Sequence, residues 1–181
     1  MKTHFHTLVH HFLEGSAEKF PDKVALVHEN VRATYAQINA KANQLANLLI
    51  DQGVTRGDRV ALILENGLEY VISYYGSLKA GAVVAPLSSD IKPDGLRYLL
   101  GKLEAKAIIS AAKYENILQE SDLSKFHLQA LVLKSPKLKW SSNSPAILSW
   151  DDLFNGDNSP SPNLRIEETA LASSIFTSGS T

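Results

Sequence analysis

The chain has 181 residues, of which 44% are hydrophobic and 20% charged, and its formal net charge is -1. These proportions are typical of an ordinary globular protein and argue against disorder over the whole length. The near-zero charge argues against a broad electrostatic surface for nucleic acid or anionic lipid. With no cysteine, a disulfide framework, a thiolate metal site and a cysteine nucleophile are excluded.

The N-terminal segment, MKTHFHTLVHHFLEGS, has histidines within its apolar stretch and no small-residue cleavage pattern, so it does not resemble a signal peptide. No run approaches the ~18 apolar residues needed to span a bilayer. We therefore expect a cytoplasmic protein with no membrane span. The same segment predicts an amphipathic helix that ends before Pro21, because its apolar residues fall on one helical face: Phe5, Leu8, Val9, Phe12 and Leu13.

A short strand and a capped helix are predicted next. VALVH at 24–28 is typical of a strand, and Glu29-Asn30 of a turn. Thr34 and Gln37 have the spacing of a capping box, in which each side chain bonds the other residue's backbone N–H. The helix that follows has a buried stripe and ends before Gly53; the stripe comprises Ile38, Ala42, Leu45 and Leu49.

The next stretch predicts a strand, a helix and a second strand. VALIL at 60–64 is a continuous apolar run of the buried-strand type. Asn66 and Glu69 predict a second capping device, and Lys79-Ala80-Gly81 a helix C-terminus. AVVAPL at 82–87 is the second strand of this stretch.

The alternation continues towards the C-terminus. Pro93 predicts the start of a helix that carries Leu96, Leu99, Leu100 and Leu103. KAIIS at 106–110 is strand-like, a helix is expected around 114–120, and LQALVL at 128–133 is the next strand. Strands that alternate with helices predict an α/β fold, a mainly parallel sheet with helices on both faces. We expect 60–64, 82–87 and 106–110 to share this sheet, and antiparallel hairpins among them would contradict it.

Residues 134–166 are rich in Ser, Pro and Asn and predict a long connection inside one domain. Within it, SWDDLF predicts one capped helical turn, with its apolar side chains docked on the core: Trp150, Leu153 and Phe154. Asp151 and Asp152 are adjacent, so they do not face each other as a catalytic pair. We expect them to serve the helix N-terminus, where negative charge is favoured.

Two further patterns are candidate sites. His6 and His10 have the i, i+4 spacing of metal ligands, but no third ligand stands at matched spacing, so a solvated helix edge is the better interpretation. At the C-terminus, the strand-like ALASSIF runs into Thr177, Ser178, Gly179, Ser180 and Thr181. Such hydroxyls and backbone N–H groups can form an anion-binding nest where a parallel strand ends. From these residues alone a flexible tail is the competing interpretation, and neither G-x-x-x-x-G-K-[ST] nor G-x-G-x-x-G is present.

The C-terminal IFTSGST resembles the start of the phosphate loop of the adenylate-forming superfamily, which comprises acyl-CoA synthetases, peptide-synthetase adenylation domains and luciferases. That loop typically reads aromatic-T-S-G-S/T-T-G-x-P-K-G. Four more stretches resemble family elements in the same order: FPDKVAL, RATYAQINAKANQLANLL, GVTRGDRVALILEN and LKAGAVVAPLS. The resemblance therefore covers nearly the whole chain, and the stretches upstream of the loop are expected to be structural.

The resemblance implies a ligase that activates a carboxylic acid with ATP and Mg²⁺ and passes the acyl group to a thiol of coenzyme A or phosphopantetheine. It assigns phosphate binding to Thr177, Ser178, Gly179, Ser180 and Thr181, and assigns no catalytic or metal residue in this chain. The family's later Lys, Thr-Glu and Asp motifs are absent, so we expect 1–181 to be the N-terminal portion of an AMP-binding domain, truncated inside the phosphate loop. Such a chain alone is expected to be inactive.

The resemblance leaves the substrate class open. The stretch AVVAPLSSDIKPDGLRYLL lacks the Y-V-P-x-D-P-x-Y-P-x-E-R pattern of peptide synthetases, which favours an acyl-CoA-ligase-type parent. The start of a peptide-synthetase adenylation domain is the alternative. A rival of another class is a non-catalytic regulatory or partner-binding remnant, including one that pairs with a separately encoded C-terminal part.

Overall fold

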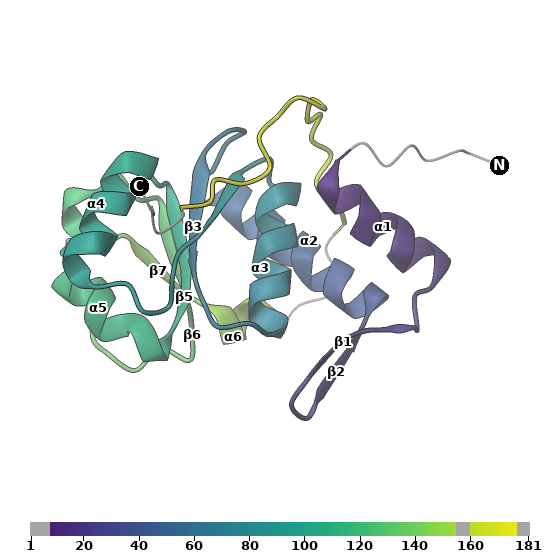
Figure 1. The fold of residues 1–181 in the computed structure, drawn as a ribbon, viewed down its shortest axis with the longest axis horizontal. Helices are drawn as coiled ribbons and strands as arrows, with labels where there is room; N and C mark the ends of the chain where they lie inside the picture. Colours follow the sequence, from purple (N-terminus) through teal and green to yellow (C-terminus); the bar gives the residue numbers. More distant parts are fainter. Residues whose placement is uncertain (1–7, 155–159, 177–181) are drawn as a thin grey trace, which may run out of the picture.

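The computed structural model describes residues 8–154 and 160–176, and its centre is a five-stranded sheet (Figure 1). The strand order is β4-β3-β5-β6-β7, and every neighbouring pair is parallel. The three strands expected to share a sheet do so, as β3, β4 and β5. The strand bounds are β3 Arg59–Ile63, β4 Val83–Pro86, β5 Ala107–Ala111, β6 Ala130–Lys134 and β7 Ala146–Ser149.

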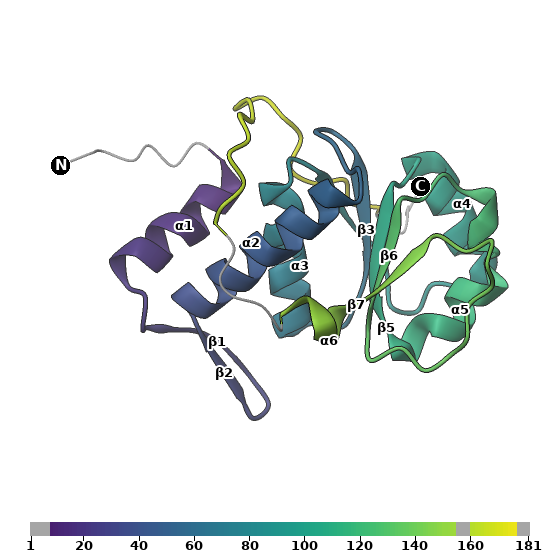
Figure 2. The same cartoon turned by 180° about the vertical axis from the view of Figure 1, so that it is seen from behind.

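Helices cover both faces of the sheet, which confirms the α/β prediction (Figures 1 and 2). One face carries α2, α3 and α6, with α1 packed outside α2 and α3, and the other carries α4 and α5. Alternate residues of β3 supply the two cores, since Val60 and Leu62 face the first and Ala61 and Ile63 the second. The helix bounds are α1 Val9–Lys19, α2 Tyr35–Asp51, α3 Leu68–Lys79, α4 Pro93–Leu103, α5 Glu115–Glu120 and α6 Trp150–Leu153, with 3₁₀ turns at Ala112–Tyr114 and Leu123–Lys125.

Two strands were missed by the sequence analysis. Strand β7 lies inside the stretch expected to be a connection, and its four residues AILS carry little signal between Pro145 and Trp150. Strand β2 (Val31–Thr34) pairs antiparallel with β1 (Val24–His28) to form a separate hairpin that extends away from the sheet (Figures 1 and 2). In the described part of the chain, no helix combines the length and apolar character needed to cross a bilayer.

The two capping predictions have different outcomes. At α2 the capping box is present, with Thr34 N donating to Gln37 Oε1 at 2.9 Å and Gln37 N to Thr34 Oγ1 at 3.3 Å. The second prediction was wrong, because Gly67 precedes α3 and makes no side-chain cap. Glu69 instead pairs with Lys134, a charged partner that β6 brings to the start of α3.

Helices α2 and α3 approach each other closely at Gly76. A Cβ atom at this position would lie 2.8 Å from Leu45 Cδ2 and 3.0 Å from Leu45 Cβ. Because overpacking a core costs about 1–3 kcal/mol, we expect Gly76→Val to lower the free energy of unfolding by about 2–3 kcal/mol in urea titrations. Gly101→Val on α4 is the matched control, since the nearest atom to its Cβ position is 4.0 Å away. Equal stability of the two variants would contradict this packing.

Candidate functional site

Residues 160–176 immediately precede the proposed phosphate loop, and we call them the lead-in segment. Near its end it lies along the outer edge of β4, where Ser173 makes a parallel bridge with Val84. Val84 N donates to Ala172 O at 3.0 Å, and Ser174 N donates to Val84 O at 2.8 Å. The expected strand is therefore reduced to one bridge. The segment runs in the direction of β4, towards the carboxyl ends of the sheet.

The end of the lead-in segment is apolar and exposed. Leu171 is 74%, Ile175 71% and Phe176 41% exposed. The hydrogen bonds given above between the lead-in segment and β4 join backbone atoms. The residues assigned to phosphate binding, Thr177, Ser178, Gly179, Ser180 and Thr181, lie outside the described residues. Their role stays a prediction.

Charged side chains gather where strands β3, β5 and β6 end. Glu65, after β3, pairs with Lys113, after β5, and this carboxylate raises the pKa of the Lys113 ammonium. Lys134 at the end of β6 pairs with Glu69. Both lysines are thus paired with carboxylates in this structure. These pairs were missed because their members are 48 and 65 residues apart.

Asp151 and Asp152, which were expected to serve the N-terminus of a helix, have more specific roles in the structure. Asp151 Oδ2 accepts from Ser135 N at 2.9 Å and from Ser135 Oγ at 3.1 Å, so it holds the backbone that follows β6. Ser149 caps α6 by accepting from Asp152 N at 3.3 Å. The predicted helical turn is confirmed, with Trp150 buried and Phe154 packed edge-on against it.

The interpretation of His10 as a solvated helix edge was wrong. His10 is only 8% exposed, because α1 turns it towards Glu14 and the buried Lys79 of α3. Burial lowers the pKa of His10 to about 4; Glu14 opposes this shift, and His11 and Lys79 add to it. His6 lies outside the described residues.

His10, His11 and Glu14 bring three ligand atoms within 4.8 Å of one another, the geometry of a candidate metal group. The Glu14 carboxylate is already bound by Lys79 and accepts from Ser161 Oγ at 3.0 Å. A cation here would face the Lys79 ammonium across a partly buried site, where charge repulsion is strong. The group is therefore better described as an ion pair than as a metal centre.

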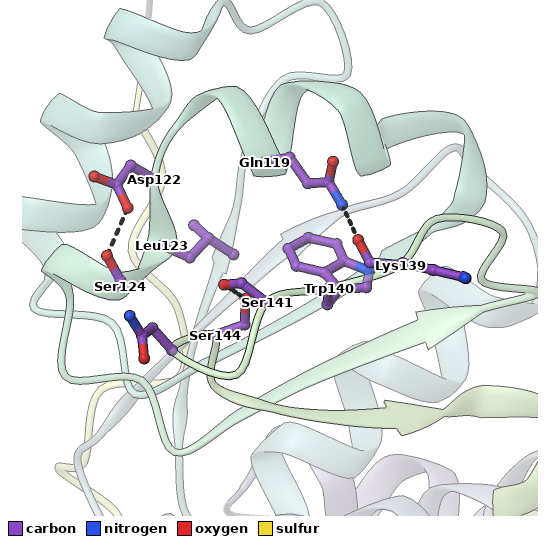
Figure 3. Close-up of a pocket in the computed structure, with 9 residues that line it drawn as sticks. Gln119, Asp122, Leu123, Ser124, Lys139, Trp140, Ser141 and Ser144 are labelled. Carbon is purple, nitrogen blue, oxygen red and sulfur yellow. Dashed lines mark hydrogen bonds between the residues drawn. The ribbon is translucent and has the colours of Figure 1, made fainter.

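A pocket of about 390 Å³ lies between the Leu123–Lys125 turn and the loop after β6 (Figure 3). Its polar groups are engaged with one another: Gln119 Nε2 donates to Lys139 O at 2.9 Å and Ser124 Oγ to Asp122 Oδ1 at 2.6 Å. They do not converge on a common point, as the polar groups of a ligand site do.

Beside this pocket, Glu115 anchors the loop, a role that sequence reasoning missed. Glu115 is 1% exposed and accepts from Lys137 N at 2.8 Å, Leu138 N at 3.2 Å and Trp140 Nε1 at 3.1 Å. Three donors from one short loop converge on this buried carboxylate, which makes it a structural anchor.

The sheet is parallel and covered by helices on both faces, and the lead-in segment runs towards the carboxyl ends of its strands. This is the architecture of open α/β domains, which generally bind ligands at the carboxyl ends of their strands. The sequence matches the AMP-binding enzyme family over residues 13–181, and the chain belongs to that family.

The relatives are synthases and ligases of much greater length. Bacitracin synthase 3 of Bacillus licheniformis is 34% identical over 173 residues, which is 96% of this chain and 2% of that protein. A medium/long-chain-fatty-acid–CoA/3-oxocholest-4-en-26-oate–CoA ligase of Mycobacterium marinum is 39% identical over 101 residues, 56% of this chain and 18% of that protein. The chain thus spans a small part of these relatives.

Solved structures share the fold. The apo structure of MbtA from Mycobacterium smegmatis has a TM-score of 0.81 and 23% identity, over 96% of this chain and 32% of that one. A fatty acyl CoA synthetase of Mycobacterium tuberculosis has a TM-score of 0.76 and 23% identity, over 95% of this chain and 33% of that one. The arrangement of elements in residues 8–154 and 160–176 is therefore that of about one third of such a chain.

Proposed function

We propose that this region belongs to an AMP-forming ligase that joins a carboxylic acid to a thiol. The carboxylate attacks the α-phosphorus of ATP, the bond to the bridging oxygen breaks, and pyrophosphate leaves the acyl-adenylate. The sulfur of the thiol then attacks the acyl carbon, AMP departs and the thiol proton passes to solvent. The observation that carries this proposal is the family match over residues 13–181, which includes the IFTSGST motif.

Residues 1–181 are, on this proposal, the N-terminal portion of the AMP-binding domain, and 134–166 is a loop-rich stretch inside it that also carries β7 and α6. The loop 177–181 supplies hydroxyl and N–H donors to the β- and γ-phosphates of ATP. Charge neutralisation by Mg²⁺ is general in such chemistry. The carboxylates described at the strand ends are already bound, Glu65 by Lys113, Glu69 by Lys134 and Asp151 by Ser135. We therefore assign Mg²⁺ to no residue of this chain.

An acyl-CoA ligase is the favoured form of this activity. The stretch after the KAGA element lacks the peptide-synthetase pattern, and the mycobacterial CoA ligase is 39% identical over 101 residues. Amino-acid activation is the second candidate, favoured by 34% identity over 173 residues to bacitracin synthase 3. Pyrophosphate exchange with a panel of fatty acids and amino acids distinguishes them, because adenylation is selective for its acid.

The hydroxyls of the loop provide a direct test. In the protein that carries the complete ligase domain, we expect Thr177→Ala and Ser178→Ala each to slow carboxylate-dependent pyrophosphate exchange about 10- to 100-fold. A hydrogen bond to a charged group contributes about 1.5–3 kcal/mol, and 1.4 kcal/mol is tenfold in rate. Ser124→Ala, on an exposed turn, is the control with unchanged exchange. Wild-type rates in both loop variants would contradict phosphate binding by 177–181.

A further inference from the structure

The lead-in segment is held in place by groups from several elements. Asn47 Nδ2 of α2 donates to Pro160 O at 3.0 Å, and Arg56 Nη1, before β3, donates to Arg165 O at 2.6 Å. The bonds at Val84 then fix its last part on β4. Figures 1 and 2 show the segment passing from α1 over to the edge of the sheet. Its course is therefore set by tertiary contacts rather than by a regular element.

Helix α1 supports this segment at two places. At the first, Ser161 Oγ donates to Glu14 Oε1 at 3.0 Å. At the second, residues at the start of α1 and residues of the lead-in segment line the same small cavity of about 30 Å³, together with the end of α3 and the turn after it. The lining residues from the start of α1 and from the lead-in segment are Leu8, Val9, His10, Ile166, Ala170, Leu171 and Ala172.

The position of α1 depends in turn on a buried charge. The Lys79 side chain is 1% exposed and pairs with Glu14, whose side chain is 32% exposed. A buried ammonium is tolerated only with a well-placed partner, so α1 must bring Glu14 to Lys79. Burial alone would raise the pKa of Glu14, but the hydrogen bond and charge of Lys79 lower it. The carboxylate therefore stays ionised at neutral pH and holds Lys79 and Ser161 together.

We propose that Glu14 is a positioning residue for nucleotide binding: the Lys79–Glu14 pair docks α1, and α1 fixes the lead-in segment that delivers 177–181. The inference rests on the proposed use of ATP by this family member. Lys79 lies five residues before Val84, so the same short stretch docks α1 and pairs with Ser173. Glu14 touches no reacting atom in this account and acts only through the segment.

Hydrogen exchange in the 181-residue chain tests the positioning without any nucleotide. The reporter is the Ser174 amide, which donates to Val84 O, and the reference is the Ile109 amide inside β5. We expect Glu14→Ala to lower Ser174 protection about tenfold or more and to leave Ile109 within threefold of wild type. The double variant Glu14→Leu with Lys79→Met replaces the ion pair by apolar contact and is expected to recover part of the Ser174 protection, because α1 docks again while the hydrogen bond from Ser161 to Glu14 stays lost. Should Glu14→Ala not fold, Glu14→Gln is the milder variant, with a fall of about threefold expected.

The complete ligase supplies the functional readout. We expect Glu14→Ala to raise the KM for ATP about tenfold while kcat changes less than threefold, and the double variant to reverse part of this rise in KM. Glu104→Gln removes an exposed ion pair with Arg59 and is the control with unchanged KM. Unaltered Ser174 protection, or an equal loss at Ser174 and Ile109, would overturn the positioning role. Absence of exchange activity in the wild-type ligase would overturn the proposed function instead, while hydrogen exchange still decides the role of Glu14.

Discussion

Replacement of Glu115 by alanine is expected to lower the free energy of unfolding by about 3–5 kcal/mol. The change removes a buried carboxylate that accepts from two backbone N–H groups and the Trp140 indole. Hydrogen bonds to a charged acceptor contribute about 1.5–3 kcal/mol each, and water that enters the loop recovers part of the loss. Urea unfolding followed by the fluorescence of the two tryptophans, Trp140 and Trp150, measures the effect.

Glu120→Ala is the matched control, because Glu120 is an exposed carboxylate at the other end of α5. We expect its unfolding free energy to stay within about 0.5 kcal/mol of wild type. Limited proteolysis adds a local readout, since the loop after β6 should be cut faster in Glu115→Ala. A Glu115→Ala protein as stable as Glu120→Ala would show that the carboxylate is not an anchor.

Acidification from pH 7 to pH 4 is expected to lower the free energy of unfolding by about 3 kcal/mol through His10 alone. Its pKa is lowered from 6.5 to about 4 by burial, while Glu14 opposes and His11 and Lys79 reinforce the shift. Between these values the unfolded chain binds a proton that the folded chain does not, so stability falls as pH falls. One pKa unit corresponds to about 1.4 kcal/mol. The contribution of His10 to the free energy of unfolding is fully present above pH 6.5 and is fully lost below about pH 4.

The non-titrating variant His10→Leu should reduce the pH dependence of the free energy of unfolding. The variant His127→Gln, at an exposed position, should leave that pH dependence unchanged. Glu14 has a lowered pKa, so its own contribution is lost below its ordinary value of 4.5, largely beneath the window of His10. Unfolding in urea at several pH values from 7 to 4.5 separates the contribution of His10 from that of Glu14. An identical slope in wild type and His10→Leu would refute the assignment.

Strong local signals predicted most of the fold. Continuous apolar runs predicted β3, β4 and β5, and the Thr34–Gln37 spacing predicted a capping box that is present. The signals failed where tertiary contacts decide. Glu69 pairs with Lys134 instead of capping α3, and β7 is a strand because β6 offers it an edge.

Sequence patterns could not predict the buried charges either, because tertiary contacts decide their partners too. From the sequence, Lys79 was interpreted as a cation that complements the C-terminal end of a helix. In the structure its charge is buried against Glu14, 65 residues away. Glu115 has the sequence context of an ordinary residue in a short helix, although it binds a loop 22–25 residues later. Such pairing is set by the packing of elements and leaves no periodic mark. The assignment of phosphate binding to 177–181, in contrast, rests on a sequence motif and stays a prediction, and the structure adds the course of the segment that precedes these residues.

Pyrophosphate exchange into ATP is the measurement that tests the central claim most directly. The protein that carries the complete domain is expected to exchange labelled pyrophosphate into ATP only when its carboxylic acid is present, since the acyl-adenylate forms reversibly. The 181-residue chain alone is expected to show no exchange. Hydrogen bonds from the loop to a charged phosphate contribute about 1.5–3 kcal/mol each, and the cost of ordering the loop, about 1–2 kcal/mol per residue, offsets most of that gain. A complete protein that exchanges no pyrophosphate with any acid tested would contradict the ligase assignment, and exchange by the short chain that is lost in Thr177→Ala would make that chain an enzyme by itself.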